Sequence, residues 1–420
     1  MISGRPKRRW HTPTYLSAVG PGLVTGAADD DPSGIATYAQ AGATYGYALL
    51  WPVVLAWPFL TAFQFTCAEI ARVTGKGLAA NLTAHLPRPA VWGVVMLLLG
   101  ANIFNIASDI AAMGEAARLV TGWNRQALMV GFALFSLGLQ VFVPYHRYVG
   151  LLKWLTVSLF AYVGVVLVAG VPWTAFLAGL WPSLPVGSAT TVVAILGTTI
   201  SPYLFFWQSA QEVEEMQLHR RVPLFQRPRG AAHELTRLAF DSGAGFLVTM
   251  VISLCIIAAT AATLHGTGGA TITTAAEAAA ALRPVAGDFA FALFALGIIG
   301  TGLLAVPVLA GSAAYALSEA MGWRAGLELK PREAAGFYGV IALSVVVALA
   351  IDLAGIDAMQ ALFWTAVING LVAVPVMVAI MALASRRAVM GRFRVRSAQG
   401  LLGWGAVLLM AGAAAAMMLA

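Results

Sequence analysis

Long apolar segments alternate with short polar loops along nearly the whole chain. A helix needs roughly 20 mostly apolar residues to cross the ~30 Å hydrocarbon core of a bilayer. By this criterion the sequence predicts an all-α integral membrane protein with a single transmembrane domain over residues 1–420. We expect eleven spanning helices, at about 15–45, 48–71, 90–117, 127–145, 149–170, 189–215, 238–263, 288–318, 335–353, 358–385 and 400–419.

Two of these segments are interrupted near their middle by polar residues and proline. The first contains Asp29-Asp30-Asp31-Pro32-Ser33-Gly34, and the sixth contains Thr199-Ile200-Ser201-Pro202-Tyr203. A charged carboxylate at the centre of a spanning helix costs about 2.5–3.5 kcal/mol on insertion scales, and such residues usually face a bundle interior or an aqueous pathway. Proline favours a non-helical stretch, and the carbonyl oxygens that it frees attract a cation. We therefore expect an ion site where the two breaks meet.

The interrupted segments are the first and the sixth, so each opens a block of five. Breaks at corresponding positions of two halves are typical of inverted repeats with a binding site at their interface. Because five is odd, the second block enters the membrane from the opposite side. The sequence predicts a first inverted repeat at 15–170, a second at 189–385, and an additional C-terminal helix at 400–419.

Composition and charge agree with a chain that lies in a membrane. Hydrophobic residues make up 60% and charged residues 10%, with a mean hydropathy of +0.82. The net charge of +7 does not indicate a nucleic-acid partner, because all but three of the 25 Lys and Arg fall on one side of the predicted topology; the exceptions are Arg118, Arg125 and Arg283. Cytoplasmic loops carry the excess of basic residues. We expect the cell (inner) membrane, with the N-terminus cytoplasmic and the C-terminus extracytoplasmic.

Signatures of enzyme chemistry are absent from the sequence. It has no Gly-Lys-Ser/Thr phosphate loop, no His-Glu-x-x-His and no Gly-x-Ser-x-Gly. Cys67 and Cys255 lie in apolar segments without metal-ligand spacing. The sequence therefore indicates a transporter that is not an enzyme, with no cofactor and no obligate protein partner beyond the bilayer and the transported ion.

The residues around the first break resemble a known family. They are similar to the first span of the NRAMP divalent-metal transporters, whose signature there is Asp-Pro-Gly-Asn. This resemblance implies a LeuT-like fold, in which two inverted five-helix repeats hold a metal ion between helices 1 and 6, both unwound at mid-membrane. It covers nearly the whole chain, through the stretches 20–34, 40–43, 46–51, 74–76, 108–109 and 195–199.

The resemblance also implies a set of metal-site residues, of which this chain keeps only part. Asp31 matches the metal-binding aspartate of the family, and Ala28 and Thr198 match positions whose backbone carbonyls face the ion. The asparagine ligand of the family falls on Gly34, which has no side chain. The methionine of its sixth-span Met-Pro-His signature falls on Ser201.

Positions that the family uses to carry protons are altered as well. The histidine of the Met-Pro-His signature reads Tyr203, and the second histidine, one turn further on, reads Gln208. Asp109 keeps an acidic position in the third span, whereas the glutamate expected three residues later is Ala112. Since histidine and intramembrane glutamate are the usual proton carriers, the resemblance implies transport without strict proton coupling. Tyr203, Gln208, Asp109 and Asp30 are the candidates for an ion or proton pathway.

These differences indicate a change in the metal that is carried. A thioether is a soft ligand that favours transition metals, whereas Mg²⁺ takes oxygen ligands and keeps several waters. Ser201 leaves an all-oxygen site, and Gly34 is expected to leave room for a partly hydrated ion. In these respects the chain resembles the NRAMP-related magnesium transporters, which implies uncoupled transport of Mg²⁺, and also Mn²⁺, by alternating access.

Two other functions stay open. A proton-coupled Mn²⁺ or Fe²⁺ importer would need Asp109 to relay protons. A LeuT-like Na⁺ or amino-acid symporter is disfavoured, because a substrate carboxylate prefers a cationic environment, whereas the first break presents the carboxylates 29–31.

Three further polar positions have simpler interpretations. Asn369, in the tenth span, is either a metal ligand or an interhelical hydrogen-bonding residue. Ser33 is expected to be a loop hydroxyl, and Glu212 is expected to belong to a solvated helix end.

Overall fold

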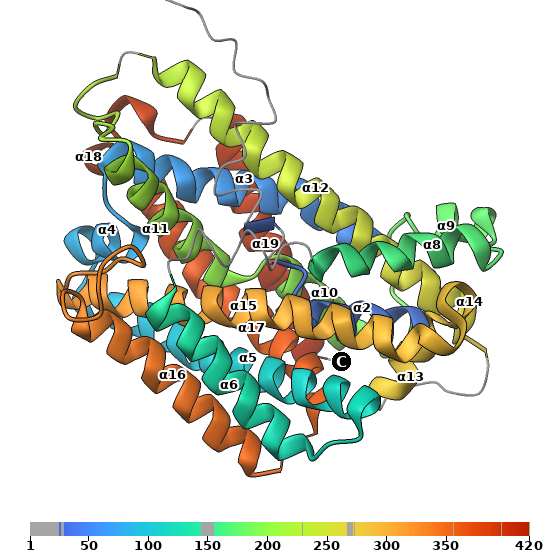
Figure 1. Cartoon of the computed structure of the whole chain (residues 1–420). Helices are drawn as coiled ribbons and strands as arrows, with labels where there is room; N and C mark the ends of the chain where they lie inside the picture. The colour runs from blue at the N-terminus through green and yellow to red at the C-terminus, as the bar shows by residue number, and fades with distance from the viewer. Residues whose placement is uncertain are drawn as a thin grey trace, which may run out of the picture.

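A computed structural model describes residues 25–26, 29–143, 155–228, 230–266, 272, 274–355, 357–395 and 397–419. In these residues all regular secondary structure is helical, and the helices cross the molecule between an end that carries α4 and α18 and an end that carries α9, α13 and α14 (Figure 1). Nine segments among them are apolar and long enough to span a membrane: α3 (Trp51–Thr74), α5 (Arg88–Thr121), α6 (Arg125–Phe142), α10 with α11 (Ala189–Thr199 and Pro202–Leu218), α12 (Ala231–Thr263), α15 (Ala290–Met321), α16 (Ala335–Leu353), α17 (Ala358–Ala384) and α19 (Ser397–Leu419).

The remaining two predicted spans are described only in part. The first contains α2 (Pro32–Tyr45), and the fifth contains η2 (Leu155–Leu159) and α8 (Phe160–Val168). Apart from the two breaks and a few residues at their ends, the predicted spans are confirmed as helical wherever the structure describes them. Segments expected as loops contain short helices in addition: α4 (Leu78–His85), α9 (Trp173–Ala178), α13 (Ala275–Ala280), α14 (Arg283–Ala286), α18 (Arg387–Met390) and η4 (Gly391–Phe393). The 3-10 turn η3 (Gly287–Phe289) lies at the start of the eighth predicted span.

Both predicted helix breaks are present. Asp31 caps α2 with extended backbone (φ −73°, ψ 170°), and α2 starts at Pro32. Helix α10 ends before Ile200 (φ −106°, ψ 62°), and α11 starts at Pro202 after the extended Ser201. Both prolines occupy the first turn of a helix, where the missing N–H has no intrahelical partner to lose. The prolines inside α3, α15 and α17 leave those helices continuous: Pro58, Pro307 and Pro375.

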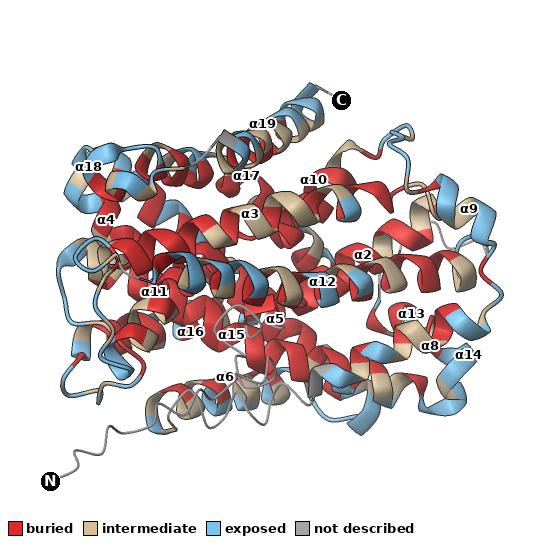
Figure 2. Cartoon of the chain, turned by 90° about the horizontal axis from the view of Figure 1, so that it is seen from above, coloured by how far each residue is buried: buried red, intermediate tan, exposed pale blue. Residues whose placement is uncertain are grey.

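The broken helices form the centre of the molecule. In the most apolar stretch of α10 and α11, 89% of residues are buried, against 22% in α6 and in α19. Figure 2 shows the same arrangement, with buried residues through the middle and exposed ones at the two ends and on the peripheral helices. The polar residues of both breaks therefore lie in the interior.

Glycines allow the broken helices to touch their neighbours through the backbone. A Cβ at Gly197 of α10 would lie 2.1 Å from the carbonyl oxygen of Ala366 and 2.4 Å from the amide nitrogen of Gly370, both on α17. A Cβ at Gly42 of α2 would lie 2.3 Å from the carbonyl oxygen of Ile257 on α12. Neither contact leaves space for a methyl group. Helix α10 therefore packs directly against the backbone of α17, and α2 against that of α12.

The first prediction tests this packing. Gly197→Ala is expected to lower the free energy of unfolding by about 3 kcal/mol, because overpacking against a backbone forces the helices apart. Gly100→Ala is the matched control, since no atom lies within 4 Å of a Cβ at that helical position. It should be neutral or stabilising by up to ~1 kcal/mol. Melting temperatures of the two purified variants in detergent test the difference, and equal values would contradict it.

Candidate functional site

Asp31 is held by hydrogen bonds from both sides of the site. Its Oδ1 accepts hydrogen bonds from the Ser33 hydroxyl at 2.6 Å and from the Gly34 amide at 2.8 Å. Its Oδ2 faces the Tyr203 hydroxyl of α11 at 3.4 Å, a long contact. The residue is 1% exposed, so the carboxylate is enclosed between the two broken helices.

Further hydroxyl and carbonyl oxygens lie at the second break. The Ser201 hydroxyl donates to the carbonyls of Thr198 at 2.8 Å and Gly197 at 3.1 Å, which bends it back onto the last turn of α10. The Thr198 hydroxyl lies 3.4 Å from the Ser33 hydroxyl. The structure thus brings Asp31, Thr198 and Tyr203 together and holds Ser201 on the same turn as Thr198. These groups offer hard oxygen atoms and no sulfur.

Two positions differ from what the sequence suggested. The room expected beside Gly34 is occupied, because a Cβ there would lie 3.2 Å from the Thr198 hydroxyl and 3.4 Å from the Tyr38 ring. The missing side chain lets α10 approach α2. Ser33 is not a loop hydroxyl: it lies buried in the first turn of α2 and is bonded to Asp31.

Asn369 is engaged with another helix. Its amide exchanges two hydrogen bonds with the amide of Asn105 on α5, at 2.9 Å and 3.2 Å. A second contact between α5 and α17 joins the hydroxyls of Ser108 and Thr365 at 3.0 Å. In this structure Asn369 therefore makes interhelical hydrogen bonds and does not contact Asp31. Ala28, the other expected site residue from the first break, lies outside the described residues.

Several further carboxylate oxygens are buried and accept no hydrogen bond from the described residues. Both carboxylate oxygens of Asp29 and of Asp109, and Oδ1 of Asp30, have no hydrogen-bond partner among the described residues. Asp109 is fully buried in α5 and lies within electrostatic range of Asp31. Isolated buried carboxylates are costly, so this region favours a cation. Within the described residues, however, no group of three or more His, Cys, Asp or Glu side chains is arranged to hold a metal ion.

Gln208 links the site to a buried glutamate. The Thr25 hydroxyl donates to its Oε1 at 2.6 Å, and its Nε2 donates to Glu212 Oε1 at 3.2 Å. Glu212 is 1% exposed, so its assignment to a solvated helix end is wrong. Glu212 lies one turn beyond Gln208 on the inward face of α11. The spacing of the two residues is visible in the sequence, but the burial of Glu212 depends on the neighbouring helices.

A sizeable cavity lies along α2 on the far side of Ala36 from the first break. It has a volume of about 420 Å³ and lies between the ends of α2, α10 and α17. Ala36, one turn beyond Pro32, lies at its wall, so the cavity approaches the site. Its described lining carries no charged side chain: Ala36, Gln40, Thr44, Tyr45, Thr191, Ile272, Met359, Gln360, Phe363 and Trp364.

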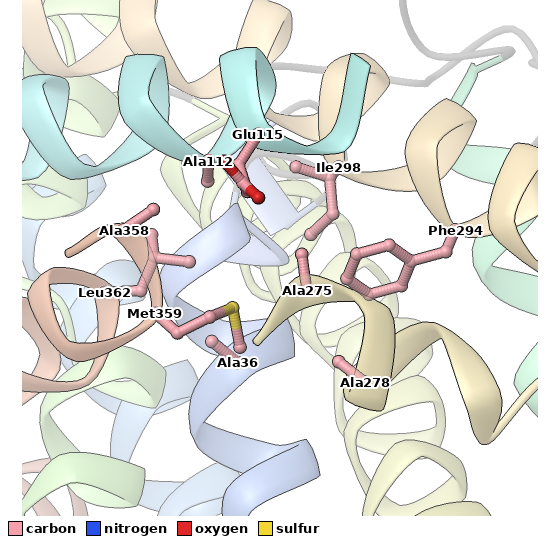
Figure 3. Close-up of a pocket in the computed structure, with 10 residues that line it drawn as sticks. All are labelled: Ala36, Ala112, Glu115, Ala275, Ala278, Phe294, Ile298, Ala358, Met359 and Leu362. Carbon is pink, nitrogen blue, oxygen red and sulfur yellow. The ribbon is translucent and has the colours of Figure 1, made fainter. Parts of the chain in front are cut away.

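A second, smaller pocket adjoins it at Ala36 and Met359 (Figure 3). Ala112 of α5 faces this pocket, so a methyl group stands where the family resemblance led us to look for a glutamate. Glu115 also lines the pocket, but it forms ion pairs with Arg118 and Arg125. The pocket is otherwise apolar and offers no chain of proton-carrying groups among its lining residues.

Comparison with known proteins gives matches over most of the chain. The family model for Nramp, the natural resistance-associated macrophage protein-like family, matches residues 22–420. A divalent metal cation transporter MntH from Yersinia pestis (strain Pestoides F) is 30% identical over 317 residues, covering 72% of this chain and 73% of the relative. The MntH protein of Pectobacterium carotovorum is 28% identical over 298 residues, covering 69% of this chain and 68% of that protein.

Solved structures share the fold. A manganese transporter of Eremococcus coleocola has a TM-score of 0.75 at 18% identity, covering 99% of this chain and 88% of that one. Mhp1, a nucleobase-cation-symport-1 family transporter, has a TM-score of 0.59 at 16% identity, covering 95% and 92%. The architecture is therefore the LeuT-like one expected from the sequence. Together with the family match over residues 22–420, this establishes that the chain belongs to the NRAMP family of divalent-metal transporters.

Proposed function

We propose that this protein carries Mg²⁺, and also Mn²⁺, as partly hydrated ions by alternating access and without proton coupling. The observation that carries this proposal is that the described side chains at the two breaks, those of Asp31, Ser33, Thr198, Ser201 and Tyr203, offer oxygen atoms and no sulfur. Ser201 supplies a hydroxyl where the family resemblance leads one to expect a thioether, and hard oxygen ligands suit Mg²⁺. The names of the relatives refer to divalent metal and manganese transport, and the extension to Mg²⁺ rests on this chain's own residues.

The proposed ligands are few, which leaves coordination positions for water. Asp31 supplies the charge, Ser201 a hydroxyl oxygen, and Thr198 and Ala28 backbone carbonyls. Gly34 supplies no ligand. Asn369 can coordinate the ion only after its hydrogen bonds with Asn105 break, so it is not a ligand in the conformation described here. Mg²⁺ demands octahedral geometry and usually keeps several waters, which fits such an incomplete protein shell.

We further propose an orientation and an entry route. The basic loops place the N-terminus in the cytoplasm and the C-terminus outside, in the inner membrane, with the inverted repeats at 15–170 and 189–385. In that orientation the 420 Å³ cavity faces outward and admits the ion toward Asp31. The inner side is closed by the contacts of Gln208 with Thr25 and Glu212, which must separate before the ion leaves.

Proton-coupled transport is the second candidate, and one observation favours it. Asp109 is a buried carboxylate with no hydrogen-bond partner among the described residues, close enough to Asp31 to respond to its charge. Against it, Tyr203 and Gln208 do not exchange protons readily at neutral pH, and Ala112 carries no exchangeable group. We therefore propose Asp109 and Asp30 as members of the ion pathway and assign Asp109 no proton transfer during the transport cycle.

The central test measures both ions at once. In proteoliposomes with an internal Mg²⁺ indicator and a pH dye, an imposed Mg²⁺ gradient is expected to give Mg²⁺ entry with no accompanying proton movement. Asp109→Asn should leave the pH trace unchanged. Exclusion of Mg²⁺, with Mn²⁺ entering together with protons, would show that the proton-coupled candidate is correct.

Asp31 should be indispensable for transport but replaceable for folding. Asp31→Asn keeps an oxygen that can cap α2 and removes the charge that binds the ion. We expect uptake to fall roughly 100-fold or more, at the upper end of what loss of a metal-site group costs, with an unchanged elution profile. Asp288→Asn, at an exposed carboxylate, is the control and should transport normally. Uptake by Asp31→Asn at the control rate would refute the site.

Ser201 should determine which metals compete. Ser201→Met introduces a thioether at the break between α10 and α11, and soft ligands favour softer metals. We expect Mg²⁺ uptake to fall about tenfold, since Mg²⁺ takes oxygen ligands, while Cd²⁺ becomes an effective competitor of Mn²⁺. Ser201→Ala removes the hydroxyl without adding sulfur and should weaken Mg²⁺ uptake without recruiting Cd²⁺. Identical competition profiles for the two variants would argue against a ligand role for residue 201.

A further inference from the structure

We infer that Ser33 is a positioning residue that restricts Asp31 to one metal-facing oxygen and thereby makes the site discriminate against Ca²⁺. The inference rests on the proposed role of Asp31 as the charged metal ligand. It concerns a residue that lies where the Asp-Pro-Gly-Asn signature has glycine, so the hydroxyl is an addition of this chain.

The hydrogen bonds of Asp31 divide its two oxygens unequally. An ionised carboxylate offers about four lone-pair sites, two on each oxygen. Oδ1 accepts from the Ser33 hydroxyl at 2.6 Å and from the Gly34 amide at 2.8 Å, which fills both of its sites. Oδ2 faces the Tyr203 hydroxyl at 3.4 Å, a long contact, and the backbone amide of Ser33 also donates to the carboxylate. An ion at this position therefore meets Oδ2 as the available ligand.

Ser33 is held in place from the opposite helix. Its proton is directed at Asp31, so the 3.4 Å contact with Thr198 places the Thr198 hydroxyl as donor to the Ser33 oxygen. This gives a chain of hydroxyls from α10 through Ser33 to the carboxylate. Ser33 is fully buried, so water does not compete for its proton. The O–H···O⁻ distance of 2.6 Å is in the range of strong charge-assisted hydrogen bonds.

One available oxygen favours small ions. Ca²⁺ takes 6–8 oxygen ligands in flexible geometry and often binds a carboxylate through both oxygens, whereas Mg²⁺ takes near-ideal octahedral coordination with waters completing the shell. Binding Ca²⁺ through both oxygens of Asp31 would require Oδ1 to give up a strong hydrogen bond. The bonds from the backbone amides of Ser33 and Gly34 remain whatever the side chain, so the Ser33 hydroxyl is the donor on which this restriction depends.

The test compares ions within one preparation. For Ser33→Ala in proteoliposomes, the ratio of the KM for Ca²⁺ to the KM for Mg²⁺ should fall roughly tenfold relative to wild type, as expected when a group that orients a metal ligand is removed. A ratio measured on the same vesicles does not depend on how much protein is folded. Ser33→Thr keeps the hydroxyl and should restore the wild-type ratio.

Ser209→Ala is the matched control. Ser209 is also fully buried, lies on α11, and its hydroxyl has no hydrogen-bond partner among the described residues. It should keep the wild-type ratio. A wild-type ratio in Ser33→Ala, or an equal change in both KM values, would overturn the inference, because a merely structural role would not separate the two ions.

The wild-type protein separates this inference from the proposed function. If it carries Mn²⁺ but excludes Mg²⁺, the proposed substrate is wrong, and the inference is then judged on the ratio of Ca²⁺ to Mn²⁺, which also accepts octahedral oxygen coordination. If Asp31→Asn transports like wild type, the proposed site fails and the inference fails with it. If wild type carries Mg²⁺ and only the Ser33→Ala ratio is unchanged, the inference alone fails.

Discussion

The structure depends on one constraint: backbone groups released by a helix break inside a membrane must find partners within the protein. Here side-chain hydroxyls supply much of that pairing. Ser201 donates to the Thr198 carbonyl at the end of α10, and Thr249 of α12 donates to the Gly26 carbonyl ahead of the first break at 2.8 Å. Tyr38 and Thr199 join the two broken helices at 2.9 Å. The breaks are tolerated because each lies where side chains of the other broken helix and of neighbouring helices can form hydrogen bonds to it.

The overall architecture was accessible from the sequence because its determinants are local. Span positions follow from hydropathy, and the breaks follow from Pro32 and Pro202 next to polar residues. The same residue types inside continuous helices, such as Pro375 in α17, show that proline alone does not specify a break. At the two breaks the proline follows a polar residue that pairs with the backbone. Asp31 caps the start of α2, and Ser201 donates to the Thr198 carbonyl at the end of α10.

The details of the site were less accessible, because they depend on residues far apart in the chain. No local pattern pairs Asn369 with Asn105, or buries Glu212 beside Gln208. The space beside Gly34 looked free in the sequence and is filled by Thr198 from another helix. The sequence shows which polar groups lie at a break. Which of these groups are already hydrogen-bonded to one another depends on how the helices pack.

In the proposed orientation, the 420 Å³ cavity faces outward and has a consequence for the rate of ion capture. Its described walls are amides, hydroxyls, aromatic rings and aliphatic groups, so it carries no fixed charge that would raise the local concentration of cations. Arrival at Asp31 should then rise in proportion to the external ion concentration and depend little on ionic strength. An entrance of this kind does not scavenge trace metals by long-range attraction, and it is best matched to an ion that is plentiful outside the cell.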